Sequence, residues 1–93
     1  MIFGENGADQ IWGGFGADTI EGGPHADALH GGSGEDRLVG GNGPDVLRGN
    51  QHNDTLIGGN GNDELIGGIG SDSANGQAGS DLCRAESKTL CER

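Results

Sequence analysis

Large aliphatic side chains recur every nine residues, each in a stretch of three residues that follows six small or polar ones. Nine consecutive nonapeptides, here called copies one to nine, run from Gly4 to Arg84 without an insertion or deletion. Position eight of the copies holds Ile11, Ile20, Leu29, Leu38, Leu47, Leu56, Leu65, Ala74 and Cys83. This spacing predicts a short strand at positions seven to nine, with position eight facing one way and its neighbours the other. Three-residue strands are not stable alone, so we expect the copies to stack.

Positions one to six predict a turn, because they are rich in glycine, asparagine, serine and aspartate. All 22 glycines stand at positions one, two or four. All nine aspartates stand at position six: Asp9, Asp18, Asp27, Asp36, Asp45, Asp54, Asp63, Asp72 and Asp81. Glycine at these positions permits a positive φ and lets the backbone approach a ligand closely.

The pattern Gly-Gly-x-Gly-x-Asp-x-U-x, with U a large aliphatic residue, resembles the calcium-binding repeat of RTX (repeats-in-toxin, haemolysin-type) proteins. The resemblance covers 81 of the 93 residues. It implies an all-β, right-handed parallel β-roll, a β-solenoid in which two nonapeptides form one 18-residue coil. Odd and even copies would then form two facing parallel sheets. Residues 1–84 would form the roll, and residues 85–93, which lack glycine and aspartate, a short C-terminal cap.

The resemblance also implies where calcium binds. In family proteins the ion lies between turns that are 18 residues apart. One turn offers the carbonyl oxygens of positions two and four with its aspartate, and the next offers those of positions one and three with its aspartate. In the copies that match best, these carbonyls belong to Gly14, Gly16, Gly31, Ser33, Gly32, Gly34, Gly40, Asn42, Gly41, Gly43, Gly58, Asn60, Gly59, Gly61, Gly76 and Ala78. Four gaps between odd copies and three between even copies give up to seven Ca²⁺ ions.

Oxygen-only ligands favour calcium over zinc, and magnesium demands a stricter octahedral geometry. The net charge of −10 is consistent with cation binding and argues against nucleic acid as a partner. No apolar stretch is long enough for a membrane-spanning segment. Aromatic residues make up 3% of the chain, so its apolar core is small against the entropy lost by 22 glycines. We therefore expect folding to require bound calcium.

Some residues depart from the pattern. His25 and His52 replace glycine at position four, and Asn50 replaces it at position two. Histidine and asparagine tolerate a positive φ better than most residues, so we expect the turns to survive, while the calcium sites that include Asp27 and Asp54 are in question. Glu5 and Gln77 replace glycine in the first and last copies, where solenoid caps are atypical. No catalytic motif accompanies the histidines.

Cys83 and Cys91 are the only cysteines. In a secreted protein such a pair favours a disulfide, which would tie the tail to the last coil, whereas two free thiols are the alternative in a reduced chain. Trp12 and Phe15 are candidates for a binding patch, an end cover or a contact with another domain. Met1–Phe3 fits positions seven to nine of a truncated copy, which indicates a piece of a longer protein.

The predicted function is a calcium-binding β-roll module of a secreted, extracellular protein. It would fold on calcium binding and serve secretion-coupled folding, stabilisation or spacing beside another domain of the same parent chain. It is not expected to be an enzyme, and any catalytic domain would lie elsewhere in the parent. The alternative is an ice- or surface-binding solenoid or adhesin segment. That function needs a ladder of like residues, whereas position seven reads Gln10, Thr19, Ala28, Arg37, Val46, Thr55, Glu64, Ser73 and Leu82.

Overall fold

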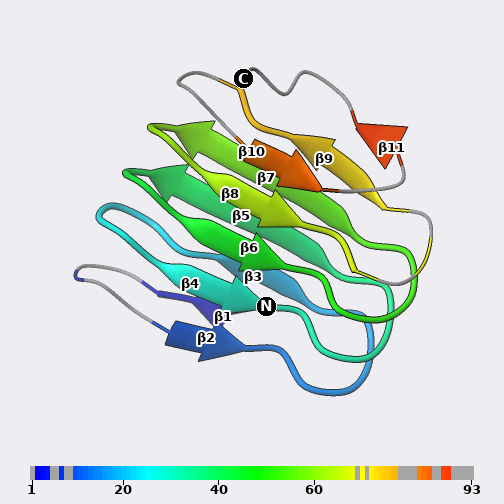
Figure 1. Ribbon diagram of the computed structural model, residues 1–93. Helices are drawn as coiled ribbons and strands as arrows, with labels where there is room; N and C mark the ends of the chain where they lie inside the picture. Colours follow the sequence, from blue (N-terminus) through cyan, green and yellow to red (C-terminus); the bar gives the residue numbers. More distant parts are fainter. Residues whose placement is uncertain are drawn as a thin grey trace.

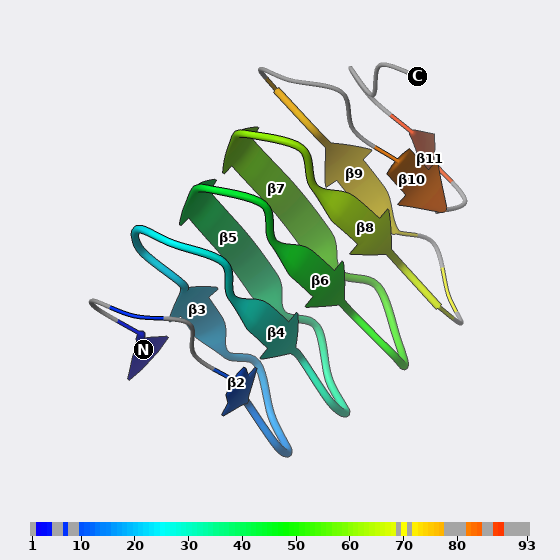
Figure 2. The ribbon, with the colours of Figure 1, turned by 60° about the vertical axis from the view of Figure 1, so that its left-hand side comes forward.

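In a computed structural model the chain forms two parallel β-sheets that face each other (Figures 1 and 2). The structure describes residues 2–4, 7, 10–68, 70, 72–77, 82–84 and 87–88, the last two segments as backbone only. The strands are β1 (Ile2–Phe3), β2 (Gln10–Trp12), β3 (Thr19–Glu21), β4 (Ala28–His30), β5 (Arg37–Asn42), β6 (Val46–Arg48), β7 (Thr55–Asn60), β8 (Glu64–Ile66), β9 (Ser73–Asn75), β10 (Leu82–Arg84) and β11 (Ser87–Lys88). None of the described residues is helical, and these residues contain no helix that could span a membrane.

Consecutive strands along the chain belong to alternate sheets. The sheet that we call the even sheet, after the even-numbered copies that supply most of its strands, has the order β1-β3-β5-β7-β9-β11. The odd sheet, formed by the odd-numbered copies, has the order β10-β8-β6-β4-β2. Ile20 pairs with Leu38 in the even sheet, and Leu47 pairs with Leu65 in the odd sheet. Both pairs are 18 residues apart, which confirms the predicted coil of two nonapeptides. Strands β1 and β2 lie at one end of the stack and β10 and β11 at the other (Figure 2).

The core is the pair of position-eight ladders that the sequence predicts. Ile20, Leu29, Leu38, Leu47, Leu56, Leu65 and Ala74 are fully buried between the sheets. Ile11 is buried at the β2 end of the odd sheet, and Ile2 is partly buried against this cluster. Because the strands are so short, only one side chain per strand faces inward. The core is therefore one residue wide in each sheet, and most of each coil is turn.

Strand β11 departs from the regular register. It pairs in parallel with β9, with Ser87 opposite Ser73, a shorter step than the 18 residues between coils. This backbone belongs to the segment predicted to cap the roll, whose boundary at residue 85 stays a prediction. The other residues of that segment, Cys91 among them, lie outside the described residues. Only the backbone of Cys83 is described, so the predicted disulfide is not tested.

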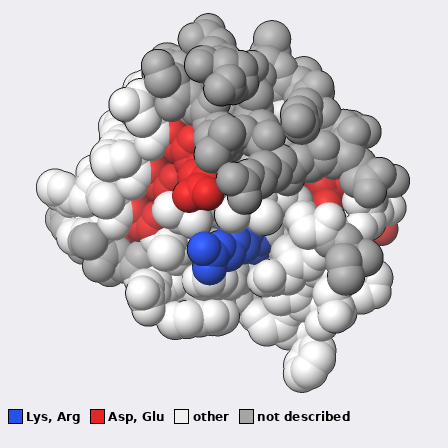
Figure 3. Space-filling model, in the orientation of Figure 1, with Lys and Arg blue, Asp and Glu red and all other residues white. Residues whose placement is uncertain are grey.

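The outer face of the odd sheet carries a column of flat side chains. Trp12 stacks on His30 with ring centroids 5.0 Å apart and an interplanar angle of 6°, and Arg48 is next in register. Burial, and secondarily the positive charge of Arg48, lowers the pKa of His30. Trp12 and Phe15 are exposed to solvent. Figure 3 shows one basic patch on the face turned towards the viewer, with acidic side chains nearby.

Candidate metal sites between the coils

The turns bring backbone carbonyls of one coil against the backbone of the next. Gly41 and Gly43, at positions two and four of copy five, have φ values of 95° and 101°. A Cβ atom on Gly41 would lie 2.6 Å from the oxygen of Gly23, and one on Gly43 would lie 2.5 Å from the oxygen of His25. Carbonyls at positions two and four therefore point forward to the next coil. At Gly41 and Gly43 no side chain fits without displacing backbone.

Position one brings together oxygens from two coils. A Cβ atom on Gly40 would lie 2.6 Å from Asp45 Oδ2 and 2.7 Å from the oxygen of Gly58, which begins the next odd copy. The corresponding two oxygens also converge at Gly13 and Gly22. A carboxylate oxygen of one coil and a carbonyl oxygen of the next thus face the same small space. Glycine at position one leaves this space open.

The aspartates form two ladders through the turns, one in the odd copies and one in the even copies. Oδ1 of Asp45 accepts a hydrogen bond of 2.8 Å from the amide of Asp27, and Oδ1 of Asp63 accepts one of 2.8 Å from the amide of Asp45. The same bond joins Asp18 to Asp36, Asp36 to Asp54 and Asp54 to Asp72, at 2.7 to 2.8 Å. Each of these carboxylates is therefore held at the boundary between two coils. The side chain of Asp45 is only 1% exposed.

The second carboxylate oxygen has no such bond in four of these residues. Oδ2 of Asp18, Asp36, Asp45 and Asp54 is buried without a hydrogen-bond partner among the residues described. A buried, unsatisfied carboxylate oxygen is costly unless a cation or a proton neutralises it. Burial is the main cause that raises the pKa of Asp45 to about 6 and that of Asp54 to about 7, and the charge of the preceding aspartate in each column, Asp27 or Asp36, raises the pKa further. Backbone hydrogen bonds oppose this rise.

These donors suit a hard cation. Among the described residues, no group of three or more histidine, cysteine, aspartate or glutamate side chains converges to hold a metal ion. Each gap instead joins aspartates to main-chain carbonyls, so a cation there would take much of its ligand shell from the backbone. Six to eight oxygen ligands of this mixed kind are typical of calcium. The open space in front of the position-one glycines and the unpaired Oδ2 atoms both fit such an ion.

The departures from the glycine pattern keep the shape of the turn. His25, Asn50 and His52 have φ values of 81°, 75° and 75°, which confirms that they adopt the backbone conformation expected of glycine. Gln77 does the same with a φ of 64°. Among residues other than glycine, asparagine and histidine adopt a positive φ more readily than most. Glu5 lies outside the described residues.

Several predicted site residues cannot be placed. Asp9, Asp81 and Ala78 lie outside the described part of the chain. Of the remaining predicted aspartates, six are buried: Asp27, Asp36, Asp45, Asp54, Asp63 and Asp72. Asp18 is partly exposed and still joins the ladder. The structure thus brings the described aspartates into two columns, one for the odd copies and one for the even copies, and their role as ligands stays a prediction.

A side-chain ladder at position three was not anticipated. Asn60 Nδ2 donates a hydrogen bond of 3.0 Å to Asn42 Oδ1, one coil earlier. Here strands β5 and β7 extend into the turns, so that Gly41 pairs with Gly59 and Asn42 with Asn60. The signal in the sequence was the same residue at the same position of copies five and seven. Identical amides one coil apart can pair, and this pair ties the two turns together.

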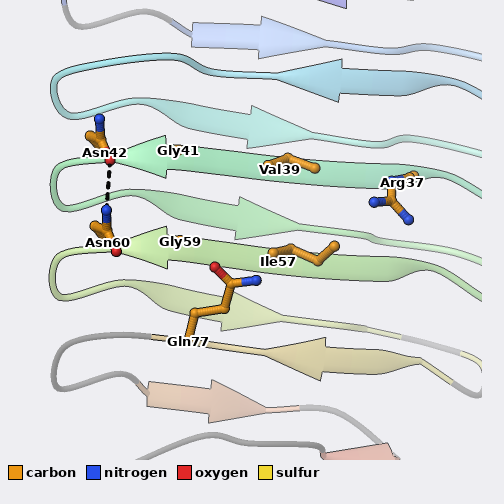
Figure 4. Close-up of a pocket in the computed structure, with 8 residues that line it drawn as sticks. All are labelled: Arg37, Val39, Gly41, Asn42, Ile57, Gly59, Asn60 and Gln77. Atoms are coloured by element: carbon orange, nitrogen blue, oxygen red, sulfur yellow. Dashed lines mark hydrogen bonds between the residues drawn. The ribbon is translucent and has the colours of Figure 1, made fainter.

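The outer face of the even sheet has a shallow groove of about 340 Å³ (Figure 4). Val39 and Ile57 lie in its middle, Arg37 lies at one end, and the carboxamides of Asn42 and Asn60 lie at the other. The side chain of Gln77 reaches towards the groove from the segment that follows β9. No carboxylate, histidine, serine or cysteine lines this groove, so its described lining offers no nucleophile with a base.

Comparison with known proteins identifies the repeat. The family model described as the RTX calcium-binding nonapeptide repeat matches residues 3–38, 30–65 and 57–87. These matches together span most of the chain and coincide with the stacked copies. No curated protein matches the chain. No solved structure matches it either.

Proposed function

Because this chain belongs to the RTX calcium-binding nonapeptide repeat family, we propose that it is a calcium-binding β-roll module of a secreted protein and that it folds when calcium binds. The observation that carries the proposal is the buried Oδ2 of Asp45, which lacks a hydrogen bond and faces the same space as the oxygen of Gly58. The described part of the chain offers that oxygen no hydrogen-bond donor. A divalent cation would supply a positive partner for it.

The best-formed gap lies between copies five and seven. Its proposed ligands are Gly41 O, Gly43 O and Asp45 from one turn, and Gly58 O, Asn60 O and Asp63 from the next. Aspartates that face two gaps would contact two ions, so the ions would be shared along each column. When bound, calcium would neutralise the stacked carboxylates and link successive coils. The chain's own contribution is a set of turns that hold the oxygens in place.

We assign the module to the extracellular space. Calcium sites in extracellular modules commonly have dissociation constants of about 10⁻⁴–10⁻³ M, well above the calcium concentration in the cytosol. A chain of this kind would stay unfolded before export and fold outside, which supports a role in secretion-coupled folding, stabilisation or spacing. Any catalytic activity would belong to another domain of the parent protein. That domain is also the proposed partner of the roll.

A calcium titration followed by far-UV circular dichroism tests this function. We expect a largely disordered spectrum in calcium-depleted buffer and a β-sheet spectrum at millimolar calcium. Magnesium at the same concentration is the control and should restore little structure, because it demands near-octahedral geometry. A sheet spectrum that does not change on calcium depletion would contradict calcium-coupled folding.

A further inference from the structure

His52 makes a contact that no glycine could make. It stands at position four of copy six, with a φ of 75°. Its Nδ1 accepts a hydrogen bond of 3.0 Å from the amide of Gly34, at position four of copy four. We call the space between these two turns the 4/6 gap, and the space between copies five and seven the 5/7 gap. The His52 side chain therefore reaches back across the 4/6 gap.

The same amide has a different partner in the 5/7 gap. There the amide of Gly43, also at position four, donates a 3.0 Å hydrogen bond to the carbonyl oxygen of Asn60. Asn60 is at position three, and its carbonyl is one of the proposed calcium ligands. The bond from Gly43 holds that carbonyl towards the preceding coil. In the 4/6 gap the equivalent carbonyl belongs to Gln51, and the amide that would orient it is bound to the imidazole.

The backbone of the His52 turn is unaffected on its other side. A Cβ atom on Gly68 would collide with the oxygen of Asn50, and one on Gly70 with the oxygen of His52. These carbonyls therefore point forward to copy eight, as they do in the regular copies. The substitutions in copy six thus leave the donors of the following gap in place. Their effect falls on the 4/6 gap alone.

The imidazole is not itself arranged as a metal ligand. It lies close enough to Asp36 and Asp54 to interact with both carboxylates electrostatically. The three side chains nevertheless do not converge as a metal-binding group among the described residues. Oδ2 of Asp36 is still buried without a hydrogen bond, so the gap keeps a reason to bind a cation. What it lacks is the fixed position-three carbonyl.

We propose that His52 makes the 4/6 gap a weaker calcium site than the 5/7 gap, because its imidazole takes the amide that orients the position-three carbonyl in the 5/7 gap. Calcium in the 4/6 gap would have to draw in the Gln51 carbonyl without that support. The 5/7 gap would fill before the 4/6 gap and empty after it. This inference rests on the proposed calcium-binding function.

The test is a calcium titration of the full chain followed by amide ¹H–¹⁵N NMR spectra. The amides of Gly34 and Gly43 report on the 4/6 and 5/7 gaps. In the unaltered chain, Gly34 should show a further shift after the roll has folded, at a calcium concentration up to about tenfold higher than the Gly43 response. That range corresponds to one competing hydrogen bond. His52→Gly should remove this delay.

His25→Gly is the matched control. It makes the same substitution at position four of an odd copy, where φ is also positive, and should leave the delay of Gly34 unchanged. His52→Asn, which tolerates the same φ but lacks the ring, is a second variant and should act like His52→Gly. Simultaneous responses of Gly34 and Gly43 in the unaltered chain, or a delay that survives both His52 variants, would overturn the inference. A chain that shows no response to calcium would instead contradict the proposed function.

Discussion

The 5/7 and 4/6 gaps share one core but differ in their turns. In the 5/7 gap, strand pairing continues into the turns and the two asparagines bond at 3.0 Å. In the 4/6 gap, the only bond between position-three side chains is a long one of 3.5 Å, from Ser33 to Gln51, and His52 spans the coils instead. Fully buried position-eight side chains stack beneath both turns. The core therefore sets the coil, and positions two to four set the quality of each gap.

The largest effect should come from closing the 5/7 gap. Gly59 has a φ of 92°, and a Cβ atom there would collide with the oxygen of Gly41. Gly59→Ala adds that collision to the unfavourable left-handed backbone, which costs about 1–2 kcal/mol on its own. We expect the calcium midpoint of folding, measured by circular dichroism, to rise by at least about tenfold.

Asn50→Gly is the matched change in the turns of the even copies. It is at the same position in the 4/6 gap and removes a residue with positive φ, so it should lower the midpoint or leave it unchanged. A small effect of Gly59→Ala, similar to that of Asn50→Gly, would mean that the two gaps do not differ in the way described.

A second effect should distinguish the aspartates of the two columns. Asp45 faces the 5/7 gap and the gap between copies three and five, whereas Asp54 faces the weaker 4/6 gap and the gap between copies six and eight. Replacing either by asparagine removes charge while keeping the shape of the side chain. Asp45→Asn should raise the calcium midpoint more than Asp54→Asn does, because Asp45 faces the stronger 5/7 gap and a bond to a charged group contributes about 1.5–3 kcal/mol. Equal midpoints in titrations of the two variants would argue against unequal gaps.

A third effect concerns pH in the absence of calcium. The folded-state pKa of Asp45 is raised to about 6 and that of Asp54 to about 7, mainly by burial, above an ordinary value of 3.8. A raised pKa means that the folded state holds its proton more tightly than the unfolded state. This contribution to stability is complete below the ordinary pKa and is lost as pH rises through about 6 to 7.

We therefore expect the calcium-free chain to have more sheet structure near pH 4 to 5 than near pH 8. Circular dichroism in calcium-depleted buffers across this range measures it. Asp54→Asn should remove the part of the transition near pH 7, and Asp45→Asn the part near pH 6. A pH-independent spectrum would show that burial does not raise the pKa of these carboxyl groups in the calcium-free fold.

The smallest effect should come from the exposed side chains at position three. Asn42→Ala removes the 3.0 Å bond to Asn60 and should destabilise the calcium-bound roll by about 0.5–1.5 kcal/mol. Ser33→Ala removes only the long contact to Gln51 and should have no measurable effect. Thermal unfolding in saturating calcium compares them. A loss of stability in Ser33→Ala as large as that in Asn42→Ala would contradict this difference between the 4/6 and 5/7 gaps.

The regular part of the fold could be predicted from the sequence. Leu47 and Leu65 occupy the same position of copies two apart, so the repeat and its resemblance to known proteins gave both the pairing and the core. The direction of the His52 side chain was not accessible. The pattern marks His52 as a departure, but only the folded structure places its ring against Gly34 in the preceding coil. A positive φ turns the side chain away from the course that an ordinary residue would follow, and a linear pattern carries no such information.

The central claim is that calcium holds the coils together, and small-angle X-ray scattering tests it most directly. The folded roll has a Cα radius of gyration of 11.3 Å, whereas an unfolded chain of this length should have about 30 Å. We predict a compact particle close to the folded value at millimolar calcium, and an expansion towards the unfolded value when calcium is removed at neutral pH. A particle that stays equally compact without calcium would contradict the account.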